Sequence, residues 1–399
     1  MRMKPMSAWF VSDAAVMAAI SLQPIYVMLA ARGLGADSYV AGLIASASVL
    51  IKLVFGIVGG AAVDVSDRRV LMIASGALQS CIWLLFAVLV FFGVANVVLF
   101  SACALGSALV WGLLGGAADA ALRGIAQDET EYVQAKTACE GRNSAIGLVC
   151  SPLGAALYCV SPMAVPIVQA VLFAVAACFA AALPSGEGRR KLAKSSDDRA
   201  HKGAGVLLEG FARVVRQRRI MRLLVTASLI NFAYQVWQYG LQYVLLDSGQ
   251  SGLSISVLDM ASCAGVMLGA CVAMRRKNGT TPEKAIHMVL IALLGASVCL
   301  LLRAEGSLGP TLALFIFSLP MPRASASMQG EIFIGVPDAM QGRARSVLNV
   351  AAQGFALIAP LAASYLAGNG AYWAISSFSL VPVLLGVCLV SRRISNARC

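Results

Sequence analysis

The sequence alternates between apolar runs of about 20 residues and short polar stretches. An α-helix that crosses a bilayer needs roughly 20 predominantly apolar residues, so each run predicts one transmembrane helix. Polar stretches and Pro/Gly signals place the boundaries. The twelve expected spans are 8–31, 39–63, 70–93, 96–120, 134–160, 163–183, 221–246, 253–274, 284–302, 308–332, 343–366 and 371–391. The pattern predicts an all-α polytopic membrane protein.

The longest polar stretch, residues 184–220, separates six spans from six spans. It predicts an N-terminal six-helix bundle over 1–183, a cytoplasmic linker over 184–220, and a C-terminal six-helix bundle over 221–399. At the end of the linker, apolar residues gather on one helical face and arginines fall mostly elsewhere. This arrangement is typical of an amphipathic helix at the headgroup layer.

The two halves resemble each other at an offset of 208 residues. Arg68-Arg69 falls on Arg276-Lys277, and Ser151-Pro152-Leu153 falls on Ala359-Pro360-Leu361. The pairs Gly56/Gly60 and Gly265/Gly269 match one residue out of register, and both have the GxxxG spacing that lets helices approach closely. Six spans per half make the copies parallel repeats, a duplication typical of transporters with a site between two bundles. The fold expected from the pattern therefore has two pseudo-symmetric six-helix bundles.

The composition agrees with a membrane protein. The chain has 399 residues, of which 59% are hydrophobic and 13% are charged, and its mean hydropathy is +0.81. Soluble domains are about 45–50% apolar and about 25% charged. These values exclude a soluble, disordered or disulfide-scaffold protein. The 11 cysteines are scattered, mostly inside apolar runs, where they predict small packing residues.

The net charge of +12 would suit a nucleic-acid partner, but the positions of the charges argue against one. Of the 31 lysine and arginine residues, 27 belong to the N-terminus, the even-numbered loops, the C-terminus and the span ends beside them. Arg32 and Arg303 lie on the opposite side, and Lys52 and Arg323 lie inside spans. This distribution follows the positive-inside rule. It predicts a multi-pass protein of the plasma (inner) membrane with both termini cytoplasmic and no nucleic-acid partner.

Several motifs carry a family resemblance. The loop after span 2 has Gly60, Asp64, Asp67, Arg68 and Arg69 in the form G-x-x-x-D-x-x-D-R-R. Residues 336–346 read V-P-D-x-x-x-G-R-x-x-S, and Ser12-Asp13 opens the first span. Together they resemble the major facilitator superfamily, and its branch of macrolide-type drug exporters and the enterobactin exporter. A bacterial lysophospholipid transporter group shares much of this layout.

The resemblance implies the major facilitator fold, with two bundles that rock about a midplane cavity. It implies that the first, fourth, seventh and tenth spans line that cavity. It also implies drug:proton antiport without a soluble cofactor. No nucleophile–base pair, metal cluster or phosphate loop is visible in the sequence, so an enzyme is not expected.

The loop between spans 2 and 3 has its own chemistry. Asp64 and Asp67 end one helix, while Arg68 and Arg69 begin the next. Opposite charges at two helix ends can latch one conformation and be released by a change in packing. Alternatively, the two arginines only set the membrane topology.

Ionisable residues inside spans are costly and tend to face a cavity or a partner. Lys52, in the middle of span 2, predicts either a site for a substrate anion or coupling ion, or a structural ion pair within the N-terminal bundle. Arg323 lies below Pro320 and Pro322, which we expect to break span 10. Because arginine cannot lose its charge, Arg323 must meet water, an acid or a substrate anion.

Span 7 carries amides at Asn231, Gln235, Gln238 and Gln242, a spacing of 4, 3 and 4 that makes one helical stripe. In lipid these amides would be unsatisfied, so the stripe faces water or protein. It predicts part of the substrate cavity; the alternative is a row of interhelical hydrogen bonds. Aromatic and amide linings suit an amphipathic organic solute.

The expected function is proton-coupled efflux of an amphipathic small organic compound by a monomer that binds no metal. Alternatives on the same fold are a lysophospholipid or lipid mover and an uptake symporter, and outside it a receptor or structural protein without transport. The candidate substrate-binding residues are Gln23, Tyr26, Lys52, Trp111, Asn231, Tyr234, Gln235, Gln238, Gln242, Arg323, Asn349 and Gln353. The candidate coupling or gating residues are Asp13, Asp64, Asp67, Arg68, Arg69, Asp119, Asp259, Glu331 and Arg343.

Overall fold

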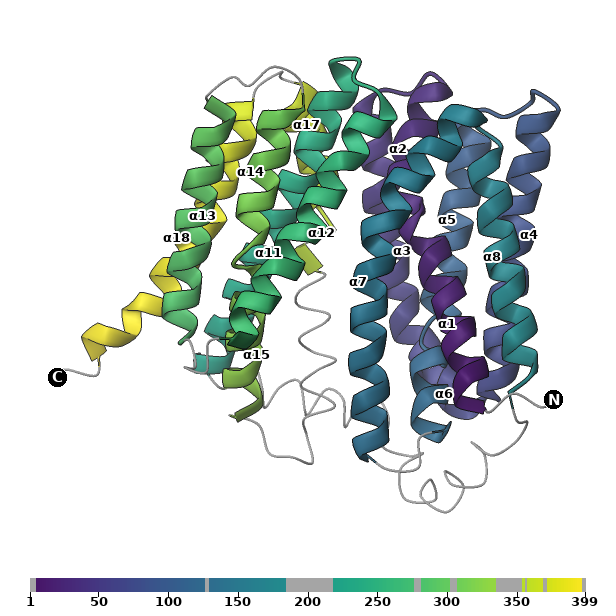
Figure 1. Cartoon of the computed structure of the whole chain (residues 1–399), viewed down its shortest axis with the longest axis horizontal. Coiled ribbons are helices and arrows are strands. Elements are labelled where there is room, and N and C mark those ends of the chain that lie inside the picture. The colour runs from purple at the N-terminus through teal and green to yellow at the C-terminus, as the bar shows by residue number, and fades with distance from the viewer. Residues whose placement is uncertain are drawn as a thin grey trace. The chain divides into compact units, whose positions relative to one another are not determined.

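The computed structural model describes residues 5–125, 129–183, 218–275, 281–301, 307–334, 354–355, 357–368 and 372–396. The chain divides into two compact units, residues 1–200 and 201–399. Most of the expected linker lies outside the described residues. Within the described ranges the regular structure is entirely helical, in agreement with the predicted all-α class (Figure 1).

Eight helices lie in the described part of the first unit. They are α1 (Pro5–Ser21), α2 (Gln23–Gly33), α3 (Ser38–Val65), α4 (Arg68–Phe91), α5 (Val97–Leu114), α6 (Ala117–Ile125), α7 (Glu129–Val160) and α8 (Ala164–Ala181). The described helices of the second unit are α11 (Arg218–Asp247), α12 (Gly252–Arg275), α13 (Pro282–Leu301), α14 (Leu308–Ser318), α15 (Met321–Ile334), α17 (Ala359–Gly368) and α18 (Tyr372–Asn396).

Nine helical stretches in the described part of the chain are long and apolar enough to cross a membrane. They are Pro5–Gly33, Ser38–Gly56, Arg68–Phe91, Val97–Leu122, Ala164–Ala181, Ile220–Asp247, Gly252–Ala273, Pro282–Leu300 and Tyr372–Leu389. The other three expected spans correspond to α7, to α14 with α15, and to the span that ends in α17. Within the described residues, some of the expected spans are built from two helices.

The same pairs of spans pack together in both units. In the first unit α3 packs on α5, α4 on α8, α1 on α8 and α1 on α7. In the second, the equivalent pairs are α12 with α14, α13 with α18, α11 with α18 and α11 with α17. This repetition of helix pairs matches the pseudo-symmetric bundles expected from the 208-residue offset.

Glycines create the close contact between spans 2 and 4 and between spans 8 and 10. A Cβ atom on Gly59 of α3 would lie 2.3 Å from the Leu113 carbonyl oxygen of α5. One on Gly265 of α12 would lie 2.6 Å from the Phe315 carbonyl oxygen of α14, and one on Gly269 would lie 2.0 Å from that of Leu319. The two glycines of the GxxxG motif in α12 therefore allow α14 to approach closely, as expected. On α3 the closest contact falls on Gly59, a position that the motif did not include.

We expect Gly269→Ala to destabilise the protein by about 1–3 kcal/mol, because overpacking against a backbone carbonyl forces two helices apart. Thermal unfolding of the purified protein in detergent measures the change. Gly295→Ala in α13 is the control, since its Cβ would meet only Ile316 Cγ2 at an ordinary 3.9 Å. A loss of stability no larger than in this control would refute close packing at Gly269.

Where the structure describes the chain, three of the expected spans are interrupted. In span 10, α14 ends at Ser318 and α15 begins at Met321. The break predicted at Pro320 and Pro322 is therefore confirmed. Span 1 breaks between α1 and α2 at Leu22, two residues before Pro24, which provides no N–H donor. Span 4 breaks between α5 and α6 at Gly115-Gly116. A Cβ on Gly115 would lie 2.5 Å from the Trp111 carbonyl oxygen, so the chain needs glycine there.

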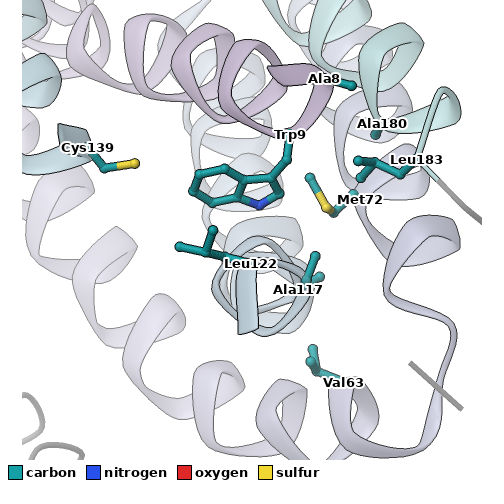
Figure 2. Packing of buried hydrophobic residues seen from close by; sticks show 10 residues of the cluster. Ala8, Trp9, Val63, Met72, Ala117, Leu122, Cys139, Ala180 and Leu183 are labelled. Carbon is teal, nitrogen blue, oxygen red and sulfur yellow. The ribbon is translucent and has the colours of Figure 1, made fainter. Parts of the chain in front are cut away.

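A buried apolar cluster closes one end of the first unit (Figure 2). Trp9 of α1 lies among Met72, Ala117 and Leu122, which come from α4 and α6. Its indole N–H donates to the Ala118 carbonyl at 2.9 Å. The cluster also holds Val63 near the end of α3 and thereby fixes the helices on both sides of the loop at residues 66 and 67.

Candidate functional site

The first unit contains a charge pair between α1 and α7. Arg142 forms a salt bridge with Asp13, and both side chains are about nine-tenths buried, with 12% and 11% exposed. Arg142 also donates to the Phe10 carbonyl at 3.0 Å and lies over the Phe10 ring, 4.5 Å from its centroid. Asp13, a candidate for coupling or gating, is therefore held by Arg142, one of the 27 basic residues that the charge distribution places on the cytoplasmic side.

A polar network lies at the break of span 1. The Gln23 side-chain amide donates to Ser107 Oγ at 3.2 Å. The Ser107 hydroxyl donates to Gln79 Oε1 at 2.7 Å, and the Gln79 side-chain N–H donates to the Ser107 carbonyl at 2.9 Å. Gln169 donates to the Ala19 carbonyl at 3.1 Å. The structure thus brings Gln23 together with spans 3 and 4, through residues that the sequence did not single out.

Tyr26 lies in an aromatic core. It is 1% exposed and makes edge contacts with Trp83, Phe86, Phe100 and Tyr158. Its hydroxyl reaches the Pro162 carbonyl at 3.5 Å. Trp111, the other aromatic candidate of this unit, is half-buried on α5. Tyr26 thus packs the bundle in this conformation, and its expected contact with substrate stays a prediction.

Lys52 is half-buried in the middle of α3. Its Cα would lie 3.3 Å from a Cβ on Gly112 of α5. Among the described residues, no hydrogen bond or ion pair is found for its ammonium group. The alternative of a structural ion pair therefore has no support from the described acids of this unit.

The loop between α3 and α4 is tied to neighbouring helices of its own unit. Asp67 caps α4 by accepting from the Arg69 backbone N–H at 3.0 Å. Arg68 donates to the Ala120 carbonyl of α6 at 2.8 Å, and Arg69 donates to the Ala181 carbonyl at the end of α8. Arg69 sits favourably there because cations stabilise helix C-termini. The proposed latch stays a prediction, and the Asp64 side chain is outside the description.

In the second unit, two amides of α11 converge on one carboxylate of α12. Gln238 and Gln242 donate to Asp259 Oδ1 at 3.1 and 2.5 Å. Asp259 is 8% exposed and Gln242 is 3% exposed. Hydrogen bonds to a charged acceptor are stronger than neutral ones, so these bonds stabilise the ionised carboxylate. The spacing of the stripe brings Gln238 and Gln242 together, and Asp259 joins them from the next span.

Tyr234 continues the contact between α11 and its neighbours. Its hydroxyl hydrogen-bonds Ser262 of α12 and lies 3.3 Å from Ser318 Oγ of α14. Three members of the span 7 group therefore make interhelical hydrogen bonds, the alternative considered for the stripe. Asn231 and Gln235 are half-buried on α11, as is Arg323 in the first turn of α15.

Other candidates are less well described. Asp119 is exposed in the first turn of α6. Glu331 belongs to α15, but its side chain is outside the description. Arg343, Asn349 and Gln353 lie outside the described residues. Among the residues that are described, no group of three His, Cys, Asp or Glu side chains could hold a metal ion.

These bundles define the class of protein: a polytopic membrane transporter with polar and charged groups inside its spans. The sequence matches the Major Facilitator Superfamily over residues 8–360. The chain therefore belongs to this superfamily, as the signature loop indicated. A search among curated proteins finds no significant match.

Solved structures share the fold at low sequence identity. The nucleoside transporter NupG is 12% identical with a TM-score of 0.70, over 97% of this chain and 99% of that one. An inward-facing bacterial homologue of the lysosomal transporter Spinster is 12% identical with a TM-score of 0.73, over 96% and 95%. An inward-facing bacterial homologue of ferroportin is 13% identical with a TM-score of 0.69, over 97% of each chain. The predicted major facilitator fold is confirmed.

Proposed function

We propose that this transporter exports an amphipathic organic compound in exchange for protons. The observation that carries the proposal is the buried Asp259 carboxylate, held by two amides from the polar stripe of α11. An ionisable residue within a span is costly unless it has a function or a partner. Two of the hydrogen-bond partners of Asp259, Gln238 and Gln242, belong to the stripe that we expect to contact the solute.

Protonation of Asp259 would change the contact between α11 and α12. An ionised carboxylate holds the N–H groups of Gln238 and Gln242, which lie 3.1 and 2.5 Å from Oδ1, more strongly than a neutral carboxyl group does. Protonation would therefore weaken these two hydrogen bonds. A solute group that donates to the ionised carboxylate would be displaced when the proton binds. The proton and the solute thereby compete for Asp259, which is what an exchange mechanism requires.

The character of α11 supports an amphipathic organic solute. Tyr234, Gln235 and Gln238 are half-buried and provide hydroxyl and amide groups next to apolar side chains. Such a mixture suits organic ligands, which need apolar contact and a few directional hydrogen bonds. The charge distribution of the sequence supports a plasma (inner) membrane protein with both termini in the cytoplasm, and we take the transporter to act as a monomer.

Purified protein in proteoliposomes tests the proposal with a panel of fluorescent amphipathic dyes of positive, neutral and negative charge. We expect an imposed pH gradient to drive at least one dye against the proton flow, and a protonophore to abolish this movement. Transport that ignores the gradient would refute proton coupling. Movement of dye together with protons would favour an uptake symporter, movement of labelled lysophospholipid alone a lipid mover, and binding without flux a receptor.

A further inference from the structure

We infer that Lys52 binds an anionic group of the transported solute, so that the substrate is an organic acid or zwitterion. The inference deepens the proposed function and rests on the chain being a solute transporter. Lys52 is the fifteenth residue of the 28-residue helix α3. At a rise of 1.5 Å per residue it lies about 20 Å from either end, too deep for its side chain to reach the headgroups readily.

Lys52 lies on the side of α3 opposite to an exposed apolar stripe. Leu43, Leu50, Val54 and Val58 form an apolar stripe in which each residue is 45–57% exposed. Lys52 follows Leu43 by nine residues, which at 3.6 residues per turn is half a turn away from the stripe. It shares its side of the helix with Ala41 and Val63, which are 1% and 5% exposed. The lysine therefore points away from the exposed apolar stripe of α3.

Glycines surround this position. A Cβ on Gly112 of α5 would lie 3.3 Å from Lys52 Cα and 3.0 Å from Phe55 Cβ, so α5 presents no side chain here. A Cβ on Gly56, one turn after Lys52, would lie 3.9 Å from the Gly112 carbonyl oxygen. Gly112 thus contributes no side chain beside Lys52, and Lys52 is half-buried.

The charge itself requires a partner. One turn before Lys52, the Ser48 hydroxyl donates to the Ile44 carbonyl at 2.7 Å. Asp13, the described acid buried in span 1 of this unit, is already paired with Arg142. Of the other described acids of this unit, Asp37 caps α3 and Asp67 caps α4, while Asp119 and Glu131 lie on α6 and α7. An ammonium in the middle of a span is stabilised by an anion, and the solute can supply it as a carboxylate or a phosphate.

Thermal shifts of the full-length protein in detergent test this inference. The probes are matched pairs at equal ionic strength: 4-phenylbutyrate against 4-phenylbutanamide for a carboxylate, and phenyl phosphate against phenol for a phosphate. We expect at least one anion to raise the melting temperature while its neutral partner does not. The responding pair identifies the source of the negative charge. If neither anion outperforms its neutral partner, the inference is wrong.

Variants locate the effect. We expect Lys52→Met to weaken binding of the responding anion about 10- to 100-fold, the usual loss when a hydrogen bond to a charged group is removed. Lys52→Arg should keep most of the affinity, and Lys284→Met, at an exposed lysine of α13, should keep all of it. Undiminished binding in Lys52→Met overturns the inference. Lys52→Gln serves as a second variant if Lys52→Met does not fold. A lack of proton coupling would leave this binding assay unchanged.

Discussion

Asp259→Asn is expected to abolish accumulation driven by a pH gradient while leaving the protein folded. Asparagine has nearly the same shape, and its carbonyl oxygen can still accept from Gln238 and Gln242. It cannot bind a proton, so transport loses its link to the gradient. If one proton is exchanged per solute, a gradient of one pH unit sustains about a tenfold solute gradient, since one pH unit corresponds to about 1.4 kcal/mol. The variant should reach only equal concentrations on the two sides.

The measurement is made in proteoliposomes with the dye that the wild-type protein moves. Exchange of labelled for unlabelled dye needs no net proton movement, so it should continue in Asp259→Asn and show that binding and rocking survive. Asp247→Asn, at an exposed position at the end of α11, is the matched control and should retain full coupling. A variant that still concentrates dye as the wild-type protein does would contradict the role of Asp259.

The fold was largely predictable because the bilayer imposes a strong length requirement on apolar runs. The repeat and the break at Pro320 and Pro322 followed from spacing and from proline chemistry. The breaks in spans 1 and 4 were missed because Pro24 and Gly115 interrupt runs that remain apolar on average. Only the packing of Gly115 against Trp111 shows why that span cannot continue as one helix.

The site was predictable in its parts but not in its pairings. Periodicity placed Gln238 and Gln242 on one face, yet a single sequence cannot say which helix lies opposite. Arg142 was missed for a different reason. It belongs to the polar first half of α7, and counting it with the topology charges hid its position. The available signal was a basic residue eight positions inside an expected span, with Asp13 as an unmatched acid at similar depth in span 1.

Arg142→Ala should give one of the largest losses of stability in the first unit. Removing one partner of a buried ion pair typically costs about 3–5 kcal/mol, because the remaining charge is left without compensation. Both side chains are about a tenth exposed, so we expect the lower end, about 3 kcal/mol. In a unit of some 200 residues this corresponds to roughly 6–12 °C in melting temperature. Thermal unfolding of the purified protein in detergent measures it.

The double variant Asp13→Asn/Arg142→Gln separates the charge from the packing. It removes both charges and leaves groups that can still hydrogen-bond, so it should be clearly more stable than Arg142→Ala. Arg142→Lys should be intermediate: it keeps the charge but loses the planar group over Phe10 and the second hydrogen bond to the Phe10 carbonyl. If the double variant is as unstable as Arg142→Ala, the contact with Phe10 rather than the pair with Asp13 holds α1 against α7. In that case Asp13 would again be a candidate for proton coupling, because its charge would not be needed for the fold.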